Sequence, residues 1–220
     1  MPRYVMKFTK SGYTKYISHL DLLRVFKRAF KVMGLDIKYS QGFNPHPKMG
    51  FAQPLSLGYS SLSEYLEFET LTEHDTEELT EGLRPNLPED VEILELFLFN
   101  SEVRTLAAET VACGYDIYIP TDLDIIDIEN ISKKYLAQKS IKAMKRMKKT
   151  KAFEEVEIRD KIRSIDVKKE GNTAVLSCVL DSGSQSNLSP ELIISSLLSI
   201  LLSSSCALIG PSFDSAPNEL

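Results

Sequence analysis

Two stretches near the N-terminus contain the side chains best suited to acid–base or binding chemistry. The first is Ser18-His19-Leu20-Asp21, and the second, over residues 39–48, reads YSQGFNPHPK. A histidine changes charge near neutral pH and a lysine can stabilise a phosphate, so His19, His46 and Lys48 form a candidate catalytic set. The prolines on either side of His46 would hold its imidazole in a fixed direction.

The segment between these stretches predicts a helix with a basic face. Ser18 is a favourable N-cap, Asp21 suits the first turn and Gly34 suits the C-terminal stop, which together predict a helix over residues 19–33. Capping alone would explain Ser18 and Asp21 without any ligand. Apolar residues follow one side of this helix, and cations recur on another side at Arg24, Lys27, Arg28 and Lys31.

These cations belong to a pronounced segregation of charge. The net charge of −5 conceals 10 Lys/Arg against 2 Asp/Glu in residues 1–50, and 2 against 14 in residues 51–110. Residues 131–151 add 9 Lys/Arg and no acid. A row of cations on a helix is usually a solvated face, but two basic blocks in one chain favour contact with a polyanion such as RNA.

Hydrophobic periodicity predicts the elements that must position these residues. A half-buried strand is expected over residues 3–8, followed by the helix. The first half then continues with two strands, a helix and a strand, over residues 35–39, 65–69, 75–83 and 91–97. This βαββαβ order is that of a ferredoxin-like fold.

The second half repeats the order loosely. We expect a strand at 111–119, a helix at 125–138, extended chain from Ile141, strands at 162–167 and 173–180, a helix at 191–202 and a last strand at 207–209. The predicted fold class is therefore α+β, with tandem ferredoxin-like lobes built on antiparallel sheets. The first lobe would span residues 1–105 and the second residues 106–220.

This predicted topology brings the two stretches together. The helix would begin at the end of the sheet where the first strand stops, and the strand at 35–39 would return the chain to that same end. The loop after it would then form a cleft beside the helix N-terminus, whose N–H groups suit an anion such as phosphate. The expected binding residues are Ser18, His19, Asp21, Arg24, Lys27, Arg28, Lys31, Gln41, Gly42, Phe43, Asn44, His46 and Lys48.

Cysteine usage and hydropathy argue against several classes of protein. The chain has three cysteines, an odd number, and they lie far apart in the sequence at Cys113, Cys178 and Cys206. This pattern indicates reduced thiols and no disulfides. No stretch resembles a secretory signal or is long enough to cross a membrane, so a cytoplasmic location is expected. The sequence contains no nucleotide-binding glycine motif and no convincing set of metal ligands, and neither a cofactor nor a metal is expected.

The same residues also resemble a known family. The pattern has four parts in chain order: Lys7-Phe8-x-Lys10-x-Gly12, then Tyr16-x-Ser18-His19-Leu20-Asp21, then the 39–47 run, and finally Gly58 with Glu64-Tyr65. This pattern closely resembles an uncharacterised bacterial family found fused to, or encoded beside, radical SAM proteins. The resemblance implies a radical SAM protein as partner and a place in RNA modification. The chain itself lacks the cysteine spacing that holds an iron–sulfur cluster, so it is not expected to be the radical enzyme.

Three functions follow from these observations. The favoured one is a non-catalytic accessory protein that binds or presents tRNA or rRNA in a radical SAM pathway, although the sequence lacks the aromatic run of RNP-type domains. The second is a metal-independent RNA endonuclease that uses His19 and His46. The third is a protein-binding adaptor whose acidic segment docks the radical SAM partner.

Overall fold

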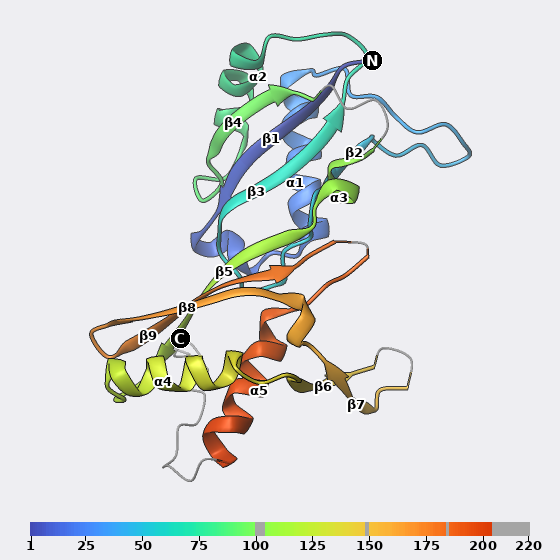
Figure 1. The fold of residues 1–220 in the computed structure, drawn as a ribbon. Coiled ribbons are helices and arrows are strands. Elements are labelled where there is room, and N and C mark those ends of the chain that lie inside the picture. Colours follow the sequence, from blue (N-terminus) through green and yellow to red (C-terminus); the bar gives the residue numbers. More distant parts are fainter. Residues whose placement is uncertain (100–103, 148–149, 184, 204–220) are drawn as a thin grey trace, which may run out of the picture. The chain divides into compact units, whose positions relative to one another are not determined.

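The computed structural model describes residues 1–99, 104–147, 150–183 and 185–203 (Figure 1). The chain divides into two compact units, Met1–Val111 and Ala112–Leu220. Both units mix helices with strands, and the described strand pairs are antiparallel. The expectation of an α+β protein with antiparallel sheets is therefore confirmed.

The first unit is a four-stranded sheet with the strand order β2-β3-β1-β4. Its elements are β1 (Arg3–Lys10), the 3-10 helix η1 (Gly12–Tyr16), α1 (His19–Met33), β2 (Met49–Phe51), β3 (Ser61–Glu69), α2 (Thr76–Leu83), η2 (Arg84–Asn86), β4 (Ile93–Leu98) and α3 (Leu106–Glu109). From β1 to β4, the order of strands and main helices is the βαββαβ order that the sequence predicts.

The core of the first unit lies between α1 and one face of this sheet. Alternation along β1 turns Tyr4, Met6 and Phe8 toward the helix, and all three are fully buried. Phe26 joins α1 to the sheet, because its ring packs against Phe8 at 4.9 Å and against Phe51 of β2 at 6.2 Å between ring centroids. These aromatic contacts fix β2 beside α1.

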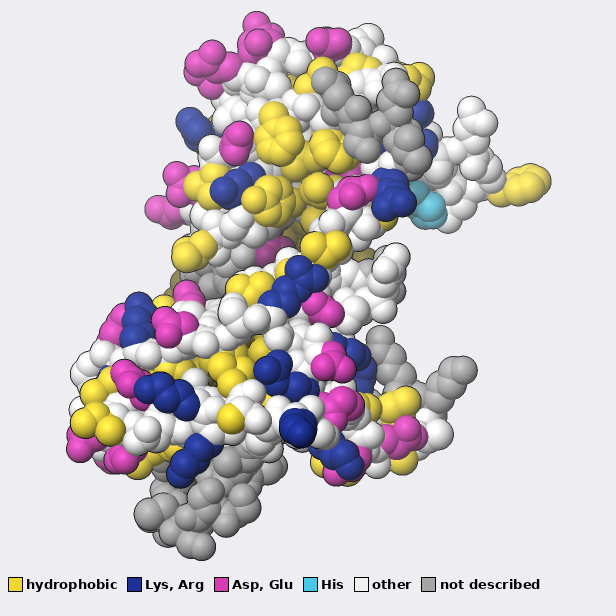
Figure 2. Space-filling model, viewed as in Figure 1, with side chains coloured by type: hydrophobic (Ala, Val, Ile, Leu, Met, Phe, Trp, Pro, Cys, Tyr) yellow, Lys and Arg dark blue, Asp and Glu magenta, His cyan; other side chains and the backbone are white. Residues whose placement is uncertain are grey.

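The opposite face of the sheet is partly covered by the chain that follows β4. The Leu106 N–H donates to the Glu67 carboxylate on β3, and the Arg3 guanidinium donates to the Arg104 carbonyl at 2.8 Å. Hydrophobic side chains gather over this side of the first unit in Figure 2. Val5 of β1 is fully buried, so β1 has buried residues on both of its faces.

The second strand lies further along the chain than the sequence predicts. Residues 35–39 form two isolated β-bridges, at Ile37 and Tyr39, and the strand that pairs with β3 is β2, at Met49–Phe51. A short apolar segment has the same pattern whether it forms a bridge or a strand, so periodicity does not separate the two. The 39–48 loop therefore precedes β2 and does not follow it.

The second unit differs from the predicted lobe. Its elements are β5 (Ala112–Pro120), α4 (Ile125–Leu136), β6 (Lys142–Arg146), β7 (Phe153–Glu157), η3 (Arg159–Lys161), β8 (Ile162–Glu170), β9 (Thr173–Asp181) and α5 (Pro190–Ser203). The described strands form a sheet of order β5-β9-β8 and a separate β6-β7 hairpin. The hairpin still contributes to the core of this unit, because Ala143 of β6 is buried and its cross-strand partner Val156 of β7 packs against the core. The predicted last strand, 207–209, lies outside the described residues, and a second ferredoxin-like lobe is not confirmed.

Two further expectations concern membranes and disulfides. Within the described ranges, no helix is long and apolar enough to cross a membrane. Cys113 and Cys178 are free thiols, as expected. Cys206 lies outside the described residues.

Candidate functional site

The N-terminus of α1 is capped by its own side chains. The Ser18 hydroxyl accepts the Asp21 N–H at 3.2 Å and donates to the Asp21 carboxylate at 2.7 Å. Asp21 also pairs with Arg24, and the hydrogen bonds from Ser18 and then Arg24 lower the pKa of Asp21 below its ordinary value. Capping therefore accounts for Ser18 and Asp21, and it gives Arg24 an acidic partner.

The two stretches picked out in the sequence lie at opposite ends of the first sheet. α1 begins just after β1 ends, where the buried Lys10 ammonium donates to a main-chain carbonyl at 3.2 Å. The chain then runs back along the sheet, so that the Lys38 N–H donates to the carbonyl of Glu69, the residue paired with Arg3 at the start of β1. The 39–48 loop projects from this end, beside β2 (Figure 1). A helix of 15 residues separates the two ends by about 20 Å.

The expected cleft between the two stretches is therefore wrong. His19 lies at the start of α1 and His46 lies in the loop at the other end, so these histidines do not share one active site. The chain that reaches the start of α1 is the loop after β2, where the Gly58 N–H donates to the Lys15 carbonyl at 2.8 Å. The error follows directly from the misplaced second strand.

The basic face of α1 is exposed. Lys27, Arg28 and Lys31 point away from the buried residues Phe26 and Phe30 and are all exposed. Among the described residues, no acidic group lies within ion-pair distance of these three cations. Unpaired positive charges on one helix face attract polyanions.

The arms of the 39–48 loop are joined to each other near its base. Tyr39 and Pro47 form a β-bridge, and the Ser40 N–H donates to the His46 carbonyl at 2.8 Å. In return, the Ser40 hydroxyl accepts the His46 N–H at 3.0 Å. The loop therefore projects from the sheet edge with its two arms hydrogen-bonded to each other.

One carboxylate on β3 holds both arms. Glu69 Oε2 accepts a hydrogen bond from Lys38 Nζ at 2.7 Å, and Glu69 Oε1 lies 3.6 Å from Lys48 Nζ. Burial raises the pKa of Glu69, but the Lys38 hydrogen bond and the charges of Lys38, Lys48 and Arg3 outweigh it, so this pKa lies below its ordinary value. Lys48 thus has a structural partner, which weakens its candidacy as a catalytic cation.

The tip of the loop presents an aromatic ring and polar groups to solvent. Phe43 is fully exposed, and Gln41, Asn44 and His46 are exposed near it. The side chains of these three polar residues form no hydrogen bond with the described residues. Gly42 has a φ of +140°, which residues with side chains rarely adopt, so it allows the turn that leads into Phe43.

Part of the second basic block lies close to acidic residues of the β6–β7 hairpin. Lys142 pairs with Glu155 at 2.7 Å across β6 and β7, and Lys145 lies opposite Glu154 in the same ladder. On the face shown in Figure 2, basic and acidic side chains of the second unit are interspersed. Lys133, which pairs with Glu129, and Lys142 are therefore less available to a polyanion than the unpaired cations of α1.

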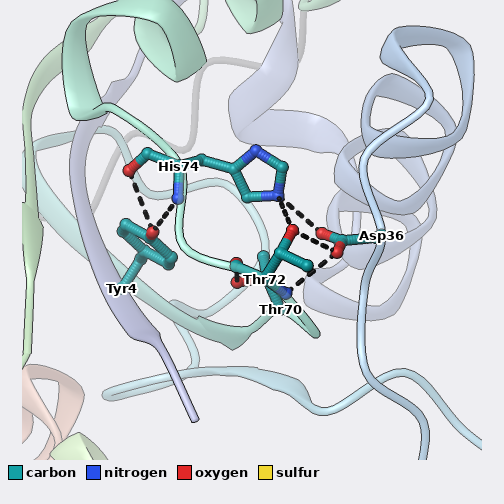
Figure 3. A network of polar contacts seen from close by, with 5 residues as sticks. All are labelled: Tyr4, Asp36, Thr70, Thr72 and His74. Carbon is teal, nitrogen blue, oxygen red and sulfur yellow. Dashed lines mark hydrogen bonds and ion pairs between the residues drawn. The ribbon is translucent and has the colours of Figure 1, made fainter.

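A polar network around His74, which the sequence analysis does not anticipate, joins the segment after α1 to the segment before α2. His74 Nε2 lies 2.6 Å from Asp36 Oδ1 (Figure 3). Asp36 Oδ2 accepts the N–H and the hydroxyl of Thr72, at 2.9 and 2.6 Å. The buried Tyr4 hydroxyl accepts the His74 N–H at 2.7 Å and donates to the His74 carbonyl at 3.0 Å. Thr70 completes the network by donating to the Thr72 carbonyl at 2.6 Å.

This network fixes one ring nitrogen of His74 and leaves the other directed away from Asp36 (Figure 3). The Thr72 hydrogen bond outweighs burial and, with the His74 hydrogen bond, lowers the pKa of Asp36 below its ordinary value. A shallow pocket beside the ring is lined by Glu73, His74, Asp75, Thr76 and Leu98. A His–Asp pair of this kind can accept a proton from a bound group. In the described part of the chain, no group of three or more His, Cys, Asp and Glu residues could hold a metal ion.

Comparison with known proteins identifies one family. A family model described as an uncharacterized protein conserved in bacteria (DUF2344) matches residues 3–190. This match covers most of the chain and extends from the first unit into the second. No curated protein matches the sequence.

Proposed function

Since the chain belongs to this family of uncharacterised bacterial proteins, we propose a function from its own surface: it is an accessory protein that binds RNA through the exposed face of α1. The observation that carries this proposal is the row of unpaired cations Lys27, Arg28 and Lys31. Arg24 lies on the same helix but already pairs with Asp21.

RNA fits this surface because Lys27, Arg28 and Lys31 are spaced along one face of α1 and have no acidic partners among the described residues. Lys27 and Lys31 lie one turn apart, about 6 Å along the helix axis, so they can meet successive groups of an extended anion. A cation that contacts a phosphate releases a condensed counterion, and this drives binding whatever the base sequence. Lys142 of the β6–β7 hairpin would first have to leave the Glu155 carboxylate.

The proposal includes a place for this RNA-binding protein in a radical SAM pathway that modifies tRNA or rRNA. Its support is the resemblance of the Ser18–Asp21 and 39–47 stretches to proteins fused to, or encoded beside, radical SAM proteins. The cytoplasm is the proposed location, where the free thiols of Cys113 and Cys178 would stay reduced. The strand order β2-β3-β1-β4 supports a ferredoxin-like description of the first unit.

Binding of fluorescently labelled RNA at several salt concentrations tests the proposal. Replacing Lys27, Arg28 and Lys31 together by Ala should weaken binding to every RNA sequence. With single strands, it should reduce the slope of log K against log salt by about 0.7 for each phosphate that the protein no longer neutralises. Lack of salt-dependent binding by the wild-type protein would contradict the proposal and favour the protein-binding adaptor.

The control variant removes the same amount of charge from the second unit. It replaces three lysines by Ala: Lys133, Lys142 and Lys168. Each of these lysines already has an acidic partner in the same unit. Because paired lysines displace few counterions, the salt slope of this variant should equal that of the wild type. An equal decrease of slope in both variants would show that total charge, and not the α1 surface, governs binding.

A further inference from the structure

We propose that the 39–48 loop is a receptor for one unstacked base of single-stranded RNA, with the base stacked on Phe43 and its edge facing Gln41 and Asn44. This inference rests on the RNA binding proposed above. It adds the kind of RNA that is bound and the residues that select it.

The loop is organised to keep its tip in place before any ligand binds. Its arms are joined by the Tyr39–Pro47 bridge and by two hydrogen bonds between Ser40 and His46. Below them, Glu69 holds the lysines at both ends of the loop. A ligand that binds at the tip therefore has little loop disorder to overcome.

The exposed ring at the tip suits a flat, apolar ligand surface. Phe8, Phe26, Phe30 and Phe68 are buried in the core, whereas Phe43 is fully exposed on a hydrogen-bonded loop. Contact between the whole ring and water is unfavourable, and a stacked base would remove much of it. Every nucleobase has a π face, so stacking of this kind tolerates different bases.

The polar groups near the ring suit the edges of a base. Each of the Gln41 and Asn44 side chains has both a donor and an acceptor, and neither forms a hydrogen bond with the described residues. The exposed His46 imidazole adds a further hydrogen-bonding group. These are the groups that read the unpaired edges of bases in single-stranded RNA.

The position of the loop relative to α1 favours RNA over a purely apolar partner. α1 leads through Gly34 and residues 35–38 directly into the loop, so Lys31 in its last turn lies at the same end of the sheet as the loop. A single strand could therefore place its phosphates on α1 and one base on Phe43. In a duplex the bases are stacked and their edges paired, so duplex RNA could meet the cations but not the ring.

Tryptophan fluorescence provides a direct test of stacking, because the chain contains no Trp. The Phe43→Trp variant places a single indole at the loop tip. Short poly(U) and poly(A) strands should quench its fluorescence, and an RNA duplex of the same length should bind without quenching. Equal quenching by the duplex would overturn the proposal.

Affinity measurements provide the second test. The Phe43→Ala variant should bind single strands about 5- to 100-fold more weakly, as expected when one stacked base is removed. Its salt slope and its affinity for the duplex should not change, and Phe43→Trp should bind single strands as tightly as the wild type. All these variants should unfold at the wild-type temperature, because Phe43 makes no core contact.

A matched control uses another exposed ring of the first unit. Tyr13 lies in η1, at the other end of α1, and is 86% exposed. The Tyr13→Ala variant should bind both kinds of RNA like the wild type. If Phe43→Ala also binds single strands like the wild type while salt dependence persists, the base receptor is wrong and the RNA-binding proposal stands. If the wild-type protein binds no RNA, both proposals fail.

Discussion

The Lys38 ammonium lies 2.7 Å from Oε2 of Glu69, at the point where the 39–48 loop leaves the sheet. The two side chains are only 23% and 17% exposed, so solvent screens this pair less than a surface pair. The same carboxylate faces Lys48 at 3.6 Å. Glu69 therefore couples the geometry of an exposed loop to the last residue of β3.

The Glu69→Gln substitution tests this coupling. It removes the charge that both lysines share while keeping the size of the side chain, and it should lower the free energy of unfolding by about 1 kcal/mol. Hydrogen exchange of the amides in residues 40–48 should accelerate, as measured by mass spectrometry. The control Glu170→Gln breaks the exposed pair with Lys168 and should leave exchange in the loop unchanged. Unaltered loop exchange in Glu69→Gln would mean that the carboxylate does not hold the arms.

The Asp36–His74 network predicts a pH-dependent contribution to stability. Because hydrogen bonding lowers the pKa of Asp36 in the folded protein, its ionised form stabilises the fold. This contribution is present above the ordinary pKa of about 4 and disappears as the pH falls through the lower folded value. Asp36→Asn should cost about 1–3 kcal/mol at neutral pH, and its difference from the wild type should shrink in acid.

Urea unfolding across this pH range measures the effect. Asp122→Asn is the control, because Asp122 is an exposed carboxylate in the second unit. Its free energy of unfolding should follow the wild type at every pH. A difference between Asp36→Asn and the wild type that stays constant into acid would show that ionisation of Asp36 does not stabilise the fold.

Phe26 is predicted to be the most sensitive contact between α1 and the sheet. The Phe26→Ala variant removes a buried ring that touches both Phe8 and Phe51, and it should lower the free energy of unfolding by about 3–5 kcal/mol. Chemical denaturation measures this decrease. Phe153→Ala, at a 63% exposed ring in β7, should cost little. Comparable decreases in the two variants would contradict the assignment of Phe26 to the core.

The two described thiols should differ sharply in reactivity. Burial, followed by the charge of Asp116, raises the pKa of the Cys178 thiol to about 11, so very little reactive thiolate forms at neutral pH. Iodoacetamide should therefore label Cys113, which is partly exposed, well before Cys178 in the folded protein. In urea the two should label at similar rates, as followed by peptide mass spectrometry. Rapid labelling of Cys178 in the native protein would show that its site opens to solvent.

The bounds of α1 could be predicted because its end signals are local. Ser18 and Asp21 satisfy the first turn between them, and Gly34 ends the helix with a φ of +76° that glycine adopts without strain. The burial of Phe26 and the exposure of Lys27 likewise follow from helical periodicity alone. These features do not depend on distant parts of the chain.

The position of the 39–48 loop could not be predicted in the same way. It depends on which of two short apolar segments, 35–39 or 49–51, pairs with β3, and that choice is made by contacts with Leu66 and Phe68 far along the chain. Because the sequence predicts the second strand at the wrong place, it also predicts the loop at the wrong end of the sheet. The predicted site therefore combines His19 with His46, which the fold keeps apart.

The His74 network could not be predicted for a related reason. Asp36 and His74 are 38 residues apart, and their contact follows no local spacing. The one local sign is that His74 directly precedes Asp75, the N-cap of α2, so its backbone direction is restrained by the start of a helix. A titratable residue just outside a cap is common, and this sign alone would not have singled it out.

The short length of β2 leaves this edge of the first sheet little free backbone for pairing with another strand. β2 is an edge strand of only three residues, Met49–Phe51, and it offers a foreign strand few free backbone groups to pair with. The other edge, β4, has six residues and bears the exposed Glu95, whose charge opposes the approach of a second acidic edge. Insertions that lengthen β2 should therefore promote aggregation through strand pairing, even where they leave the core and the exposed cations of α1 unchanged.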